Sequence, residues 1–271
     1  MCRNSRQRHT LVDVLTMYGN GAFEDAYAAL CKIMDNEPQL SKDGDVYILW
    51  AELELLANDN ATKALELLDR ACEVGYSEKG YYYKVRGDAL LDKGIYEEAI
   101  QDFERSVTLE PSVASLTMLA QALSEIDDRR AMDVWKQILE NDPINCLAHA
   151  HMGIELVKSG DRGKAMLMAK RAEKMNPSSS EELFMIGLLY YDLDEFGNSI
   201  NSYLEANKLG YKDKGFLYAC MAACYLSMNQ AVPARKYAQW AVACNPKHDY
   251  VRDVWHEYEE RFDKGENQEE N

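Results

Sequence analysis

"YKVRGDALLDKGIYEEAIQDFERSVTLEP", residues 83–111, decides how the rest of this sequence is interpreted. Apolar and small residues recur there at the three-to-four-residue spacing of a helix face, first over 83–90 and again over 99–103. Gly94 lies between the two faces, where a tight turn needs a conformationally permissive residue. Pro111 closes the stretch because proline cannot continue a helix. The sequence therefore predicts two amphipathic helices that fold back on each other.

The same pattern recurs along the chain at intervals close to the length of this stretch. Pro111, Pro143 and Pro177 are 32 and 34 residues apart, and Pro246 lies 69 residues further on. Before or between these prolines, each unit has a large, a small and a second large residue on its expected first helix. On the expected second helix a small residue follows, with a large or a small residue four positions later. The five units are Tyr83-Gly87-Leu90 with Ala99-Phe103, Leu116-Ala120-Leu123 with Ala131-Trp135, His149-Gly153-Leu156 with Ala165-Ala169, Leu183-Gly187-Tyr190 with Ser199-Tyr203, and Tyr218-Ala222-Tyr225 with Ala234-Ala238.

Small residues at fixed positions indicate close helix packing within each unit. Gly87, for example, has its counterpart in Ala99 on the second helix. Large side chains at either position would push the helices apart and remove ridge-into-groove contact. We therefore expect the second helix of each unit to cross the first one closely at these positions.

This pattern resembles the 34-residue signature of the tetratricopeptide repeat family. The resemblance implies an all-α fold, an α-solenoid with a right-handed superhelix of about seven helix-turn-helix units and a C-terminal capping helix. It also implies that the first helix of each repeat lines a concave face that binds other proteins. On this resemblance the chain is expected to be a non-catalytic interaction scaffold or adaptor.

The predicted organisation is a single solenoid domain over residues 7–248. A basic segment at 1–6 precedes it, a capping helix is expected at 249–262, and an acidic tail follows at 263–271. The first two repeats have the weakest register. The predicted repeats are 7–40, 45–78, 80–112, 113–145, 146–179, 180–214 and 215–248.

Two similar hexapeptides, "GYSEKG" at 75–80 and "GYKDKG" at 210–215, lie 135 positions apart, close to four repeat lengths. Both stand where other repeats have their proline turn. Gly75 and Gly210 suit the left-handed position that ends a helix. Tyr76 and Tyr211 are then expected to pack back on the second helix of their own repeat.

Composition narrows the class of function. The net charge of −16 leaves no cationic face to displace phosphate counterions, which argues against nucleic acid and anionic membranes as partners. No run of apolar residues is long enough to cross a membrane. Seven cysteines without a secretory leader are expected to be reduced thiols in a cytoplasmic protein.

No catalytic constellation or cofactor motif is recognisable, so no enzyme activity and no cofactor are expected. His149 occupies a repeat packing position and is interpreted as a core histidine. Cys220 and Cys224 lie one helical turn apart, but a closed zinc site needs four ligands. Buried thiols in an alanine-rich helix are the better interpretation of this pair.

The candidate partner-binding residues follow from helical geometry on the first helices. At 100° per residue, one stripe is apolar in the last three repeats, and contiguous apolar surface of this kind marks an interaction site. Polar residues on the stripe in the middle repeats would set specificity. The predicted anchors are Leu147, Ile154, Val157, Phe184, Leu188, Tyr191, Phe216 and Leu226, and the predicted polar residues are Lys84, Asp88 and Gln121.

Three other fates for the apolar stripe stay open. Neighbouring helices can bury it, the C-terminal helix can fold over it, or a second copy can cover it in a homo-oligomer. One family specialisation is disfavoured, namely capture of a peptide C-terminal carboxylate. Of the residues at the corresponding positions only Lys84 fits, and Asp88 would repel a carboxylate.

Overall fold

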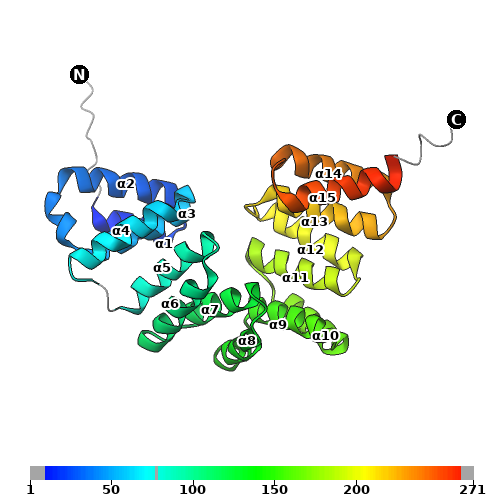
Figure 1. Ribbon diagram of the computed structural model, residues 1–271, viewed down its shortest axis with the longest axis horizontal. Coiled ribbons are helices and arrows are strands. Elements are labelled where there is room, and N and C mark those ends of the chain that lie inside the picture. Colours follow the sequence, from blue (N-terminus) through cyan, green and yellow to red (C-terminus); the bar gives the residue numbers. More distant parts are fainter. Residues whose placement is uncertain (1–9, 77–78, 264–271) are drawn as a thin grey trace, which may run out of the picture. The chain divides into compact units, whose positions relative to one another are not determined.

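The computed structural model describes residues 10–76 and 79–263, and every regular element in those ranges is helical. Seven helical hairpins follow one another and a further helix comes last (Figure 1). This order confirms the all-α helical-repeat fold expected from the sequence. The hairpins are α1 (Leu11–Gly19) with α2 (Phe23–Asn36), α3 (Gly44–Asn58) with α4 (Ala61–Glu73), α5 (Gly80–Asp92) with α6 (Tyr96–Leu109), α7 (Val113–Glu125) with α8 (Arg130–Asn141), α9 (Cys146–Lys158) with α10 (Arg162–Lys174), α11 (Ser180–Asp192) with α12 (Phe196–Lys208), and α13 (Lys214–Ser227) with α14 (Ala231–Cys244).

Three shorter elements complete the chain. A 3-10 helix, η1 (Pro38–Lys42), links the first two hairpins. The final helix α15 (Asp249–Tyr258) continues into a π-helical turn, η2 (Glu259–Asp263). The predicted basic segment at 1–6 and nearly all of the acidic tail lie outside the described residues.

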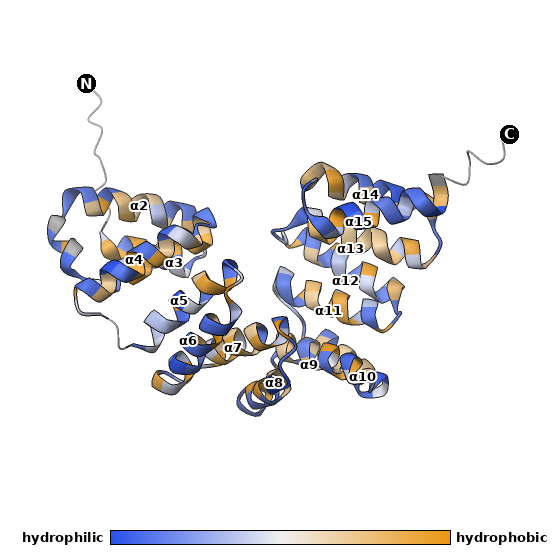
Figure 2. Cartoon of the chain, viewed as in Figure 1, coloured by the Kyte–Doolittle hydropathy of each residue, from blue (hydrophilic) through white to orange (hydrophobic). Residues whose placement is uncertain are grey.

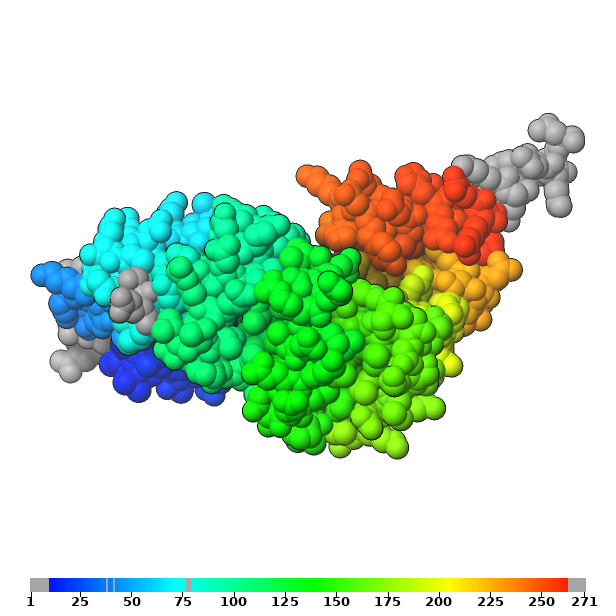
Figure 3. All heavy atoms as spheres, turned by 60° about the horizontal axis from the view of Figure 1, so that its bottom comes forward, coloured from blue at the N-terminus to red at the C-terminus, as the bar shows by residue number. Residues whose placement is uncertain are grey.

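The chain forms two compact units that meet at Val134 and Trp135, within α8. We call Met1–Val134 the N-terminal unit and Trp135–Asn271 the C-terminal unit. Within each unit consecutive hairpins pack on one another, since α4 contacts α5 and α12 contacts α13. The ordered succession of colours inside each unit shows the same arrangement in the space-filling view (Figure 3).

A left-handed residue closes the turn inside every described hairpin. Non-glycine residues in this conformation are mainly Asp and Asn, whose short side chains tolerate it. The chain alternates between these residues and glycine at a single position of the repeat. The residues with positive φ in these seven turns are Gly21, Asp59, Gly94, Asp127, Gly160, Asp194 and Asn229.

The two hexapeptide joints are Schellman caps, which confirms the left-handed glycines expected there. Gly75 and Gly210 have φ of 87° and 85°. The N–H of Tyr76 donates to the Ala71 carbonyl at 3.0 Å, and Tyr211 makes the same bond to Ala206.

The tyrosine rings of these joints reach the first helix of their own hairpin. The Tyr76 side chain lies so close to Gly44 that a Cβ there would stand 2.3 Å from the Tyr76 Cβ and 2.6 Å from its ring, and the Tyr76 hydroxyl donates to Asp45. The Tyr211 ring stacks on Phe184 with centroids 4.3 Å apart. Each ring therefore ties the end of a hairpin to its beginning.

Glycines permit the close crossing of paired helices at two of the predicted positions. A Cβ on Gly87 would lie 2.6 Å from the Phe103 ring, and one on Gly187 would lie 2.5 Å from the Tyr203 ring. Gly153 differs, because its near neighbour is Leu189 of the next hairpin at 2.3 Å. The expectation that it faces its own second helix is therefore wrong. Ala169 stands where three other hairpins have the aromatic residues Phe103, Trp135 and Tyr203, so Gly153 receives the side chain of the following repeat.

Helix α15 packs against both α13 and α14. Its Val251, Val254 and Tyr258 share a buried cluster with Leu226 and Ala238. Helix α13 is apolar along most of its length (Figure 2), and α15 supplies much of the matching apolar surface. The last helix thus adds to the stack as a further first helix would.

Replacing Gly187 by alanine tests the close crossing. We expect Gly187→Ala to destabilise the protein by about 1–3 kcal/mol, because the new Cβ must displace the buried Tyr203 ring. Gly197 is the matched control, since it also lies in a helix and has no atom within 4 Å of a built Cβ. Gly197→Ala should be neutral or stabilising by up to about 1 kcal/mol. Urea unfolding followed by circular dichroism measures both, and equal effects would contradict the packing argument.

Candidate functional site

The first helices of successive hairpins lie side by side within each unit. Helix α5 contacts α3 and α7 in the N-terminal unit, and α11 contacts α9 and α13 in the C-terminal unit. The stripe predicted from the sequence therefore runs over adjacent helices. Its character differs between the units, so each is described separately.

In the N-terminal unit the stripe carries a buried polar network centred on Glu52. The Glu52 side chain is only 5% exposed and lies 3.0 Å from the Lys84 ammonium. Tyr18 donates to the same carboxylate at 2.8 Å, and Tyr81 donates to it as well. Three helices, α1, α3 and α5, thus supply one hydrogen-bonded cluster. Lys84 is committed to this network and is not a free cation.

Asp88 is the member of this network whose carboxylate is not fully hydrogen-bonded. It lies 3.6 Å from Lys84, and its Oδ1 is buried without a hydrogen-bond partner. Burial raises the pKa of Asp88 to about 7, even though the charge of Lys84 opposes the shift. Glu52 and Asp92 add to the rise through their negative charges. Gln121, the third predicted polar residue, is half-buried on α7 next to α5.

The tyrosines of the network respond to the same burial and charge. Burial and the Glu52 carboxylate raise the pKa of Tyr18 to about 12 and raise the pKa of Tyr81 as well. Burial lowers the pKa of Lys84, but Glu52 and Asp88 outweigh it and the pKa is raised overall. Lys84 therefore stays charged and both tyrosines stay neutral around neutral pH.

In the C-terminal unit five predicted anchors are partly exposed. Leu147, Ile154 and Val157 lie on α9, and Leu188 and Tyr191 lie on α11. Ile154 and Val157 rest on the buried cluster around Ala150 and Leu189, while Leu188 and Tyr191 rest on the cluster around Phe184. These five residues, which we call the apolar stripe, stay within reach of a partner.

The other three predicted anchors pack into the unit. Phe184 is 4% exposed beneath Tyr211, and Leu226 is 1% exposed under α15. Phe216 is half-buried, with the rings of His248 and Tyr250 at 5.5 and 5.3 Å. The structure thus separates these three from the apolar stripe.

His149 and His151 occupy the interior of the C-terminal unit. The His151 ring stacks on Trp135 with centroids 4.3 Å apart, and burial lowers its pKa to about 4. The Nε2 atom of His149 lies 3.1 Å from the Pro143 carbonyl. The interpretation of His149 as a core histidine is confirmed by its burial.

Cys220 and Cys224 are buried, as the sequence predicted for them. Burial raises the pKa of Cys224 to about 11 and raises that of Cys220 further, so both stay protonated. In the part of the chain that the structure describes, no three His, Cys, Asp or Glu side chains are placed to share a metal ion. Among the same residues no helix is long and apolar enough to span a bilayer.

Residues 53–114 match the tetratricopeptide repeat family in a comparison with protein families. No curated protein sequence matches the chain. Solved structures share its fold at low sequence identity, and three of them illustrate the similarity. Residues 53–114 are therefore tetratricopeptide repeat sequence, and the described residues share the helical-repeat fold of these structures.

The first structure is a chain of the APC/C hetero-tetramer Cut9–Hcn1, with a TM-score of 0.71, 12% identity, and coverage of 94% of this chain and 49% of that one. A tetratricopeptide repeat protein from Parabacteroides merdae has a TM-score of 0.69 and 13% identity, with coverage of 92% of this chain and 96% of that one. A thermophilic TPR protein from Thermus thermophilus has a TM-score of 0.57 and 22% identity, with coverage of 66% of this chain and 98% of that one. This chain thus spans about half the length of the first of them.

The Glu52 network was not predicted from the sequence. Glu52 lies inside the run "YILWAELELL" at 47–56, where a carboxylate interrupts apolar residues. A charged residue in such a run is buried only if it is paired, so the run itself is the signal. Identifying Tyr18 and Tyr81 as its partners needs the tertiary structure, because they lie 34 and 29 residues away.

Replacing Asp88 by asparagine tests its buried charge. The pKa is raised from 3.8 to about 7, so the native state loses stability as the pH rises through this window. Asp88→Asn cannot ionise and should equal the wild type near pH 4 but exceed it by about 2 kcal/mol at pH 8. Urea unfolding across this range measures the difference. A constant difference between the two proteins would contradict the assignment.

Replacing His151 tests the opposite dependence of stability on pH in the C-terminal unit. The pKa is lowered from 6.5 to about 4, so the native state loses stability as the pH falls through this window. His151→Phe keeps a ring on Trp135 and should remove that part of the acid sensitivity. His256→Phe, at an exposed position, is the control and should retain it. Hydrogen exchange of the α9 amides from pH 7 to 4 follows the change.

Proposed function

We propose that this chain is a non-catalytic protein-interaction scaffold that binds a partner segment along its first helices. The observation that carries the proposal is the apolar stripe of the C-terminal unit, Leu147, Ile154, Val157, Leu188 and Tyr191. These large side chains are partly exposed on two adjacent helices. Apolar residues at such spacing on neighbouring helices suit an amphipathic helix or an extended segment with alternate apolar residues.

The three anchors that pack against other helices of the unit have a supporting role in this proposal. Phe184, Phe216 and Leu226 hold α11, α13 and α15 together, so they set the spacing of the surface residues without touching a ligand. In the N-terminal unit, Lys84 is held by Glu52, Asp88 lies beside Lys84, and Gln121 lies on the adjacent helix. We propose that these residues choose between partners through charge, in a cytoplasmic protein whose seven predicted repeats together form the scaffold.

Self-association is the second candidate. The five residues of the apolar stripe can also be covered by a second copy of the chain in a homo-oligomer. Light scattering coupled to gel filtration separates the two candidates, because a monomer at high concentration excludes stable assembly. A dimer that dissociates on substitution of Leu188 would replace peptide docking by assembly.

Charge substitution on the apolar stripe tests the proposal. Peptides selected on the wild-type protein from a displayed random library should bind Val157→Lys and Leu188→Lys at least tenfold more weakly, because an ammonium replaces an apolar contact. Leu167→Lys is the matched control, since Leu167 is 49% exposed on the second helix α10. Fluorescence anisotropy measures the affinity, and circular dichroism checks the fold.

Selected peptides that bind Leu188→Lys and Val157→Lys as tightly as the wild type would exclude the stripe as the binding site. Equal loss with Leu167→Lys would also exclude it, since that residue is not on the first helices. Phe184 is unsuitable for this test because it is buried and its substitution would unfold the C-terminal unit.

A further inference from the structure

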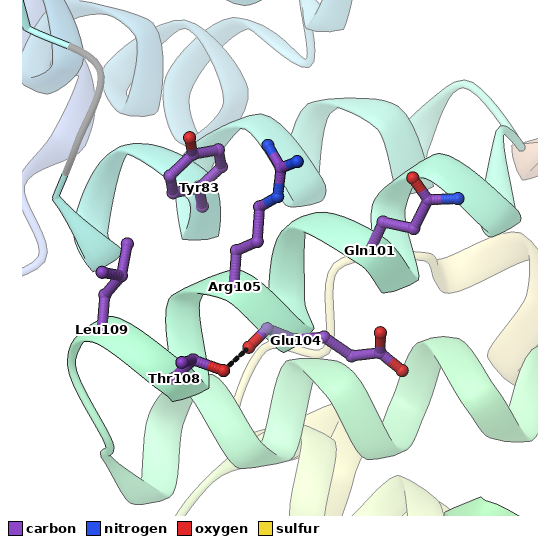
Figure 4. Close-up of a pocket in the computed structure, with 6 residues that line it drawn as sticks. All are labelled: Tyr83, Gln101, Glu104, Arg105, Thr108 and Leu109. Carbon is purple, nitrogen blue, oxygen red and sulfur yellow. Dashed lines mark hydrogen bonds between the residues drawn. The ribbon is translucent and has the colours of Figure 1, made fainter.

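A shallow surface pocket of about 490 Å³ lies on the hairpin of α5 and α6. Its lining consists of Tyr83, Gln101, Glu104, Arg105, Thr108 and Leu109. Five of these residues come from one face of α6, and Tyr83 reaches them from α5 (Figure 4). The volume is in the range of ligand-binding pockets.

Arg105 carries the one uncompensated charge among the lining residues. Within the part of the chain that the structure describes, no carboxylate pairs with its guanidinium and no hydrogen bond satisfies it. Glu104 is neutralised by Arg130 at 2.6 Å. The pocket is therefore cationic in a chain whose net charge is −16.

The neighbouring Arg86 does not share this freedom. Its Nε and Nη2 donate to both oxygens of the buried Asp102 at 2.6 Å each. Arg86 also lies over the Tyr83 ring, 5.6 Å from its centroid. The tyrosine is thereby held from one side by an arginine that is itself fixed.

Tyr83 in turn positions the free guanidinium. The Arg105 Cζ lies 5.3 Å from the centroid of the Tyr83 ring, within cation–π range. Figure 4 shows the side chains of Arg105, Gln101 and Leu109 rising from α6 to the side where Tyr83 lies, while Glu104 runs along the helix. The donors of Arg105 are thus held near the pocket without a protein acceptor.

The rest of the lining suits a ligand that is partly apolar. Leu109 is 49% exposed and forms an apolar wall one helical turn from Arg105. The Thr108 hydroxyl donates to the Glu104 carbonyl at 2.8 Å, so it has only acceptor capacity left. Gln101 adds an amide. An isolated inorganic anion would use Arg105 alone and leave Leu109 and Tyr83 uncovered.

The same site is closed in the last hairpin. Tyr218 and Trp240 stand 135 residues beyond Tyr83 and Arg105, and their ring centroids are 5.5 Å apart. Tryptophan there replaces the arginine, and Lys236 covers the Trp240 ring at 4.5 Å. The tyrosine is thus shared by these two hairpins, whereas the free guanidinium is a feature of the hairpin of α5 and α6.

We propose that this pocket binds an acidic side chain, Asp or Glu, of a partner protein segment in which an apolar residue adjoins the acidic one. The carboxylate pairs with Arg105 in the bidentate manner that a guanidinium favours. The adjoining apolar side chain packs on Leu109 and Tyr83. This site is separate from the apolar stripe, so the two bind independent parts of a partner.

The test uses the full chain, labelled with ¹⁵N, and the tripeptide acetyl-Leu-Glu-Leu-amide as probe. We expect saturable chemical-shift changes at the Arg105 Nε–H and at the α6 amides. The isosteric probe acetyl-Leu-Gln-Leu-amide should bind at least fivefold more weakly. Inorganic phosphate is the third probe, and it should be weaker than the Glu peptide at equal ionic strength.

Variants locate the binding and separate it from folding. Arg105→Gln should abolish the shifts caused by the Glu peptide, and Tyr83→Leu should weaken binding at least threefold. Arg129→Gln removes an exposed arginine elsewhere on the N-terminal unit and should leave binding unchanged. Leu188→Lys should also leave it unchanged, so failure here is distinguishable from failure of the apolar stripe.

Three results would overturn the proposal. The first is equal binding of the Glu and Gln peptides, which would remove the role of charge. The second is phosphate binding as tight as that of the Glu peptide, which would define a general anion site. The third is retention of the shifts in Arg105→Gln, which would place the binding elsewhere.

Discussion

The close crossing of paired helices is the constraint on which the other features depend. At Gly87 and Gly187 an aromatic ring from the second helix occupies the space of a missing side chain. Two helices that approach this closely present their remaining side chains at fixed positions. The outward residues of the first helix therefore form a stripe, and the packing against the second helix sets their positions. A binding surface built in this way needs no contact with its ligand to be ordered, because the packing beneath it fixes the backbone.

The first helices carry different kinds of side chain in the two units. The N-terminal unit has Glu52, Lys84 and two tyrosines on the first helices of its hairpins, and most of these polar groups form hydrogen bonds there. A satisfied network of this kind costs less than an unpaired charge but stabilises less than apolar packing. In the C-terminal unit, Phe184, Phe216 and Leu226 join helices α11, α13 and α15. The first helices therefore carry a buried polar network in one unit and apolar side chains in the other.

The fold could be predicted from the sequence because its determinants are local and repeated. The small residues, the turn glycines and the hexapeptides all stand at a fixed spacing, and the structure places positive φ at Gly75 and Gly210 as expected. The candidate site could be predicted only in part. Helical geometry identified which residues lie on the first helices, but the burial of Phe184 depends on Tyr211, and the fixing of Lys84 depends on Glu52 from another hairpin. Contacts of this kind follow from the packing of neighbours and are not encoded in one repeat.

The hexapeptide joints have a consequence for how such a chain can be lengthened. At each joint the tyrosine folds onto the first helix of its own hairpin, as Tyr76 does at Gly44 and Tyr211 does at Phe184. The hairpin is thus capped before the next one begins. The four hairpins between Gly75 and Gly210 start and finish at the same kind of joint. A tandem duplication of that segment would place a cap of the same kind at its new junction, so whole repeats could be inserted there without a new type of connection.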